Sequence, residues 1–177
     1  MAAVTSHCQG RDNAQMAVAI SAASIVPDRP RVIVQLYKTN LSHDMVLSSG
    51  AFALNFLRED QLELIGDFGL VSGRDHDKLD GVDRITGTSG SPLLTDCFGY
   101  LDCRVINAMD GGDMTCFLAD VVDGKTLSEG EPLWWRDARR KLPPELLERW
   151  EQKQSSEIAT SRNTMDNIAH TPWQPRA

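Results

Sequence analysis

Five of the six residues in the run Lys-Thr-Asn-Leu-Ser-His at 38–43 carry a side-chain hydrogen-bond donor. The run follows a strand-like segment, 31–37, and precedes a short predicted helix, 43–49. Hydroxyls, backbone N–H groups and a lysine at a helix start suit an anion such as phosphate, because that end of a helix attracts negative charge. The residues alone leave open a plainer role, in which the turn only caps the helix through Ser42. The candidate donors are Lys38, Thr39, Asn40, Ser42 and His43.

Motifs for side-chain catalysis and nucleotide binding are missing from the sequence. There is no GxGxxG and no Walker P-loop, and the string at 87–90 lacks the GxSxG spacing of a nucleophile elbow. Four aspartates between 75 and 83 do not form a calcium loop, since Leu79 stands where an oxygen ligand belongs. We interpret His76 among them as a loop residue. Without a catalytic side-chain set, an enzyme commonly takes its chemistry from a bound cofactor.

The charge balance argues against a nucleic-acid partner. Lys and Arg total 18 against 25 Asp and Glu, a formal net charge of −7, whereas a phosphate backbone requires clustered basic residues. We interpret the one basic run as a solvated rim beside a helix start, with an anion or subunit contact as the alternative. That run consists of Arg136, Arg139, Arg140 and Lys141.

The small apolar stretch at 14–26 resembles the core of a signal peptide but is too short to span a membrane. Only Arg11 precedes it, Asp12 offsets that charge, and a proline-rich turn follows at 27–30, so we predict a buried strand instead. No two cysteines have CxxC spacing, which argues against zinc and for reduced thiols. We therefore expect a cytoplasmic protein without membrane contact. The cysteines are Cys8, Cys97, Cys103 and Cys116.

Short alternating segments joined by turns indicate a mainly β fold with peripheral helices, closed or nearly closed into an antiparallel barrel. Besides 31–37, the predicted strands are 51–57, 100–109, 114–122 and one near 132–136, with a turn at Asp123-Gly124.

The predicted helices lie at the edges of this barrel. Gly50 ends the helix at 43–49, and a second helix after Glu59-Asp60 presents Leu62, Ile65 and Phe68 on one face. Residues 69–92 are predicted to form a long loop with little regular structure. Pro143-Pro144 starts a helix at 145–158. We expect a barrel domain at 1–142, followed at 143–177 by a C-terminal helix and polar tail.

Three stretches in order resemble the flavin reductase-like family, whose members form an FMN-binding split barrel. The first is KTNLSHDMVLSSGAFALNFL at 38–57. The second runs from Gln61 through Phe68-Gly69 to the loop Ser-Gly-Arg-Asp at 72–75 and Asp77-Lys78. The third combines GYLDCRV at 99–105 with DGGDMTCFLADVVDG at 110–124. Together they extend the resemblance over about residues 4–136.

The resemblance implies FMN, or FAD, as cofactor, with NAD(P)H as co-substrate. It places the flavin phosphate at Lys38, Thr39, Asn40, Ser42 and His43, with Arg74 as a second cation. The isoalloxazine ring is expected against Met16, Ala17 and Val18, where backbone N–H groups can bond its polar edge. A plain buried strand is the alternative there, and Asn55 and Phe68 are expected to be packing residues.

Two positions depart from the family pattern. Of the ring-contacting string Thr-Ala-Ser only Ala17 is retained, and Met114 stands where reductases often carry a histidine near the nicotinamide. The chain also begins close to its first strand, without the helix that usually precedes it in the family. These departures leave the use of NAD(P)H open.

The resemblance therefore implies a homodimeric NAD(P)H-dependent flavin reductase that supplies reduced flavin to a monooxygenase or another acceptor. One alternative is an FMN-binding electron-transfer flavoprotein without nicotinamide activity. Another is a non-catalytic split barrel that holds a different planar cofactor, such as haem.

Overall fold

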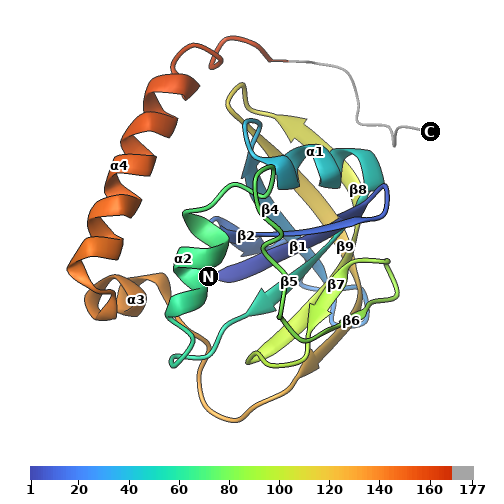
Figure 1. The fold of residues 1–177 in the computed structure, drawn as a ribbon. Coiled ribbons are helices and arrows are strands. Elements are labelled where there is room, and N and C mark those ends of the chain that lie inside the picture. The colour runs from blue at the N-terminus through green and yellow to red at the C-terminus, as the bar shows by residue number, and fades with distance from the viewer. Residues whose placement is uncertain (169–177) are drawn as a thin grey trace.

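A seven-stranded antiparallel sheet curls into a barrel in the computed structural model, which describes residues 1–168 (Figure 1). The strand order is β2-β1-β5-β8-β9-β4-β3, and every pairing is antiparallel. A backbone bond from Gln35 N–H to the Ala19 carbonyl, 3.1 Å, ties the chain after β2 to β4. The predicted mainly β split barrel with peripheral helices is confirmed. Its strands are β1 Ala2–Cys8, β2 Arg11–Ala17, β3 Ile20–Ala22, β4 Arg31–Tyr37, β5 Ala51–Phe56, β8 Gly99–Asp110 and β9 Met114–Thr126.

Four helices surround this sheet: α1 Leu41–Ser49, α2 Glu63–Gly69, α3 Trp135–Lys141 and α4 Pro144–Ser161. Helix α1 packs on β1, and α2 packs on β2. Figure 1 shows α4 standing along one side of the barrel, beyond α2. Within residues 1–168, no helix combines the length and apolar character needed to cross a membrane.

Alternating side chains of β1 and β2 serve two hydrophobic cores. Ala2, Val4 and Ala17 belong to the barrel core, together with Phe52 and Phe117. The next residues along the same strands face outward into a second core, the outer core, beneath α2 and α4. Because successive strand residues point to opposite faces, these two strands are buried on both sides. The outer core includes Ala3, Ala14, Met16, Leu57, Ile65, Phe68, Leu79 and Leu133, with Leu146 and Trp150 packed against it.

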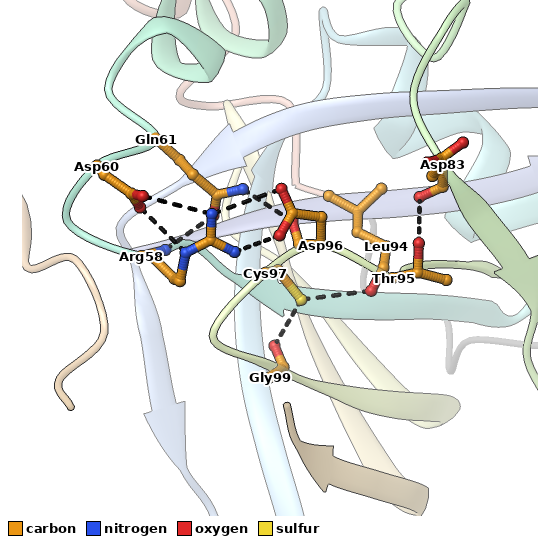
Figure 2. A network of polar contacts seen from close by, with 9 residues as sticks. All are labelled: Arg58, Asp60, Gln61, Asp83, Leu94, Thr95, Asp96, Cys97 and Gly99. Atoms are coloured by element: carbon orange, nitrogen blue, oxygen red, sulfur yellow. Dashed lines mark hydrogen bonds and ion pairs between the residues drawn. The ribbon is translucent and has the colours of Figure 1, made fainter. Parts of the chain in front are cut away.

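A network of polar contacts holds the segment after β5 to the turn before β8 (Figure 2). The Arg58 guanidinium contacts the carboxylates of Asp60 and Asp96, and Gln61 Nε2 donates to the Asp96 carbonyl at 2.8 Å. Beside them, the Cys97 thiol lies 3.4 Å from the Leu94 carbonyl, and burial raises its pKa to about 11. Together these contacts hold in place the segment between β5 and α2.

Several predicted boundaries were wrong. The segment 14–26 is not one buried strand: β2 ends at Ala17, β3 is a separate short strand, and Ile25 is fully exposed before the proline-rich turn. Asp123 and Gly124 do not turn the chain, because they pair with Asp102 and Leu101 inside the long arm of β9. In place of a strand at 132–136, Pro132 makes one isolated bridge to Arg58, just beyond β5, and α3 begins at Trp135.

The predicted loop at 69–92 is largely irregular, but it contains β6 Arg84–Thr86 and leads into β7 Pro92–Leu94, which pair with each other. The helix at 145–158 is confirmed as α4, with Pro144 in its first turn. Gly50 ends α1 in a left-handed conformation, φ 67°, as predicted. The last part of the predicted polar tail, 169–177, lies outside the described residues.

Asn55 on β5 joins β1 of the large sheet to β7 of the two-stranded sheet. Its Nδ2 donates to Thr5 Oγ1 at 2.9 Å, and its Oδ1 accepts the Leu94 N–H at 2.8 Å, all in a buried position. Asn55→Ala leaves a buried N–H without a partner, so we expect a loss of about 2–3 kcal/mol in the free energy of unfolding. Urea titration measures it. Asn107→Ala, at an exposed position, should lower the free energy of unfolding by less than about 1 kcal/mol. Equal losses for the two variants would contradict the stabilising role given to the buried hydrogen bonds of Asn55.

Candidate functional site

A cavity of about 890 Å³ lies between β2, the start of α1, the segment after α2, and α4. Its size is typical of sites for cofactors and other small molecules. It is lined by four groups of residues: Asn13 and Gln15 to Ala19 from β2 and the chain after it; Gln35, Tyr37, Thr39 to Ser42 and Met114; Phe68 to Arg74 with Lys78; and Trp135, Arg139 and Trp150 with polar residues of α4.

The polar turn before α1 forms one end of this cavity. Thr39, Asn40 and Ser42 all line it. Asn40 occupies the N-cap position, but no side chain caps the helix. The predicted Ser42 cap was wrong, since α1 begins at Leu41 and the buried Ser42 Oγ accepts a hydrogen bond from Asn13 Nδ2 at 2.8 Å. Within the turn itself, the Asn40 N–H bonds the Tyr37 carbonyl at 3.0 Å and the His43 N–H bonds the Asn40 carbonyl at 3.1 Å.

The loop at 72–74 closes over this turn. Arg74 Nη1 donates to the Thr39 carbonyl at 2.9 Å, and Nη2 lies 3.0 Å from Asp44 Oδ2. A side chain at position 73 would overlap the side chain of Asn13, so Gly73 permits the close approach. Arg74, which the sequence predicted as a second cation, thus lies beside the turn that was predicted to bind an anion.

Lys38 and His43 are the two predicted site residues that do not line the cavity. Lys38 forms an ion pair with Asp110 on the β8–β9 hairpin. His43 is buried, with Nε2 2.8 Å from Thr115 Oγ1 and its ring 5.7 Å from that of Phe117. Burial lowers the pKa of His43. The reason is geometric: His43 follows Ser42 on a helix, so its side chain is rotated toward the sheet.

The other end of the cavity is less polar. Met16, Ala17 and Val18, the predicted ring contacts, line it together with Tyr37 and Met114. Burial, followed by the Glu157 and Asp113 carboxylates, raises the pKa of the Tyr37 phenol. Tyr37 is therefore a hydroxyl donor at this end.

Helix α4 forms a wall that the sequence did not reveal. The indole rings of Trp135 and Trp150 lie 4.8 Å apart, and a side chain at Gly69 would come within 2.7 Å of Trp150. On the following turns, Lys153 and Glu157 form an ion pair and line the cavity. The only sequence signal was the spacing of 150, 153 and 157, which places them on one helix face.

Positive charge gathers at the cavity although the chain is acidic. Among residues 1–168, four cations and two carboxylates line it: Arg74, Lys78, Arg139 and Lys153 with Glu151 and Glu157. Three of the cations are ion-paired, Arg74 with Asp44, Arg139 with Glu151 and Lys153 with Glu157, so Lys78 carries the excess positive charge. Lys78 Nζ donates to the Phe68 carbonyl at 2.8 Å, and burial, reinforced by Lys153, lowers its pKa to about 8. The arrangement favours an anionic ligand.

Comparison with known proteins matches most of the chain to one family. The model of the Flavin reductase like domain matches residues 1–143. The chain belongs to the flavin reductase-like family. Helix α4 lies beyond the residues that this family model matches.

Three relatives show what the family contains. The chain is 29% identical over 167 residues to a high molecular weight rubredoxin of Moorella thermoacetica, covering 89% of this chain and 73% of that protein. It is 34% identical over 136 residues to a ferric-chelate reductase (NAD(P)H) of Archaeoglobus fulgidus, covering 76% and 79%. It is 33% identical over 113 residues to HsaB, the reductase subunit of a flavin-dependent monooxygenase of Rhodococcus jostii, covering 64% and 56%.

A solved structure agrees in fold. The NADH:FAD oxidoreductase SgcE6 of Streptomyces globisporus, in complex with NAD and FAD fragments, superposes with a TM-score of 0.68. The two chains are 26% identical, and the match covers 80% of this chain and 84% of the other.

The residues present fit a flavin mononucleotide. Its phosphate requires hydroxyl and N–H donors with a cation nearby, which Thr39, Asn40, Ser42 and Arg74 provide. Its ring requires an apolar strip with backbone donors, which residues 16–18 provide. Among residues 1–168, no group of His, Cys, Asp and Glu is arranged to hold a metal ion.

The buried ammonium of Lys78 gives a pH-dependent prediction. Its pKa is about 8 in the folded protein and near 10.5 in the unfolded chain. Between these two pKa values the unfolded chain binds more protons than the folded protein, so the free energy of unfolding rises with pH. Below about pH 8 Lys78 is charged in both states, and the destabilisation caused by burying its charge is fully present. We expect Lys78→Met to raise the melting temperature most below pH 8 and progressively less toward pH 10. Lys125→Met, at an exposed site on β9, serves as control. A gain in melting temperature that did not change with pH would contradict the lowered pKa of Lys78.

Proposed function

We propose that this protein binds FMN in the cavity and acts as an NAD(P)H-dependent flavin reductase. The observation that carries the proposal is the convergence of the polar turn at 39–42, Arg74 and the strip at 16–18 on one cavity. A bound flavin supplies the redox chemistry, accepting a hydride from a nicotinamide and passing electrons on. The chain's own contribution is binding and orientation, so no acid or base is required of it.

In this proposal the phosphate lies at the turn before α1. Thr39, Asn40 and Ser42 donate hydrogen bonds, while Arg74 adds positive charge and holds the loop at 72–74 in place. Lys38 and His43 act from outside the cavity: Lys38 fixes the hairpin tip through Asp110, and His43 anchors α1 to β9 through Thr115. FMN is preferred because one phosphate is matched by one donor cluster, and FAD is the second choice.

Reduced flavin would serve a separate acceptor. The relationship to the HsaB reductase subunit supports a monooxygenase as that acceptor, and the relationship to the ferric-chelate reductase supports a metal chelate instead. We also propose a homodimer, on the strength of the family membership, and a cytoplasmic location. Light scattering of the purified protein tests the dimer: twice the chain mass supports it, and a monomer would contradict it.

An FMN-binding electron carrier is the second candidate, and Met114 is the observation that favours it. Met114 lines the cavity, and its thioether offers no hydrogen-bond donor to a nicotinamide amide. Purified protein is therefore assayed with FMN and either NADH or NADPH. Oxidation of either nucleotide supports the reductase. Tight FMN binding without nucleotide oxidation would select the carrier.

Arg74 provides a mutational test of the phosphate end. Arg74→Ala removes a charge-assisted contact to the anion and the link to the Thr39 carbonyl, so we expect the Kd for FMN to rise at least about tenfold. Flavin fluorescence quenching measures it. Arg136→Ala, which removes an exposed guanidinium on α3, is the matched control and should leave the Kd unchanged. An unchanged Kd for Arg74→Ala would contradict the assigned phosphate end.

A further inference from the structure

Gln15 carries a buried polar atom without a partner. Its side chain is 7% exposed, and its Oε1 forms no hydrogen bond within the described structure. Buried amide oxygens are nearly always bonded, because an unpaired acceptor loses its hydration without compensation. Gln15 also lines the cavity. The chain therefore has, at the cavity wall, an acceptor that no group within residues 1–168 satisfies.

The side chain's position along β2 indicates what it faces. Asn13 and Gln15 lie on the same face of the strand, because side chains alternate, and Asn13 is bonded to Ser42 at the polar turn. Two residues of strand separate Gln15 from Asn13 by about 7 Å. The apolar strip begins at the next residue, Met16. Gln15 thus stands between the end that suits a phosphate and the end that suits a ring.

In FMN, the group that joins the phosphate to the ring is the ribityl chain, which carries hydroxyl donors. We propose that Gln15 Oε1 accepts a hydrogen bond from a ribityl hydroxyl of the flavin. The inference rests on the proposed function and deepens it, by assigning a residue that selects flavins with an intact sugar-alcohol chain. Neither the polar turn at 39–42 nor the strip at 16–18 would distinguish flavins that have a ribityl chain from those that lack it.

The proposal is tested with Gln15→Met, which keeps the length of the side chain and removes its amide, and with Gln15→Leu as a second variant. Binding is measured by fluorescence for three probes: FMN, riboflavin and lumiflavin, which keeps the ring but lacks the ribityl chain. We expect the Kd of FMN and riboflavin to rise about three- to tenfold and that of lumiflavin to stay unchanged. Gln152→Met, at an exposed position on α4, is the matched control.

Stability without ligand gives an independent readout. Removing an unsatisfied buried acceptor should raise the melting temperature of the flavin-free protein by about 2–4 °C, so the variants are expected to gain stability while they lose affinity. A lowered melting temperature would indicate a structural amide and overturn the proposal. Unchanged FMN binding would overturn it as well, and so would an equal loss for lumiflavin, which would assign Gln15 to the ring. If the unmodified protein bound none of the three probes, the proposed function itself would fail.

Discussion

The contact on which the site depends is the closure of the loop at 72–74 onto the turn before α1. Arg74 reaches the Thr39 carbonyl and Asp44, and Gly73 lies against Asn13, which in turn bonds Ser42. Three segments far apart in sequence are fixed to one another by these few bonds. No side chain caps α1, and the Arg74 guanidinium adds positive charge next to the start of that helix. In the proposed function, this junction forms the end of the site that binds the flavin phosphate.

The two cores explain how the junction is supported. Since β1 and β2 are buried on both faces, neither strand can shift by one residue without exchanging the two sets of side chains. That constraint fixes Asn13 toward α1 while Ala14 and Met16 pack under α2. Helix α4 then covers the outer side through Leu146 and Trp150 and brings the charged pair Lys153 and Glu157 to the cavity. A flavin bound in the cavity would thus be bounded on one side by the sheet and on the other by α4.

Much of the fold could be predicted from the sequence, because β4, β5 and the β8–β9 hairpin have strong alternation and the helix ends are marked by Gly50 and Pro144. The errors arose where local signals compete with long-range pairing. Asp123-Gly124 has the composition of a turn, yet partners on β8 keep it extended. At the site, Thr39, Asn40, Ser42, Arg74 and residues 16–18 were predicted and do meet at one cavity. The contribution of α4 was missed because only tertiary packing places a polar helix face over a pocket. The rotation of His43 away from the cavity and toward the sheet depends on where α1 starts.

The central claim is that the turn at 39–42, with Arg74, binds the phosphate of a flavin. The most direct measurement is the affinity of the unmodified protein for FMN and for riboflavin, which differ only by that phosphate. If the claim holds, FMN binds at least about tenfold more tightly, and the difference shrinks as salt is added. Equal affinities at low salt, or no binding of either flavin, would contradict it.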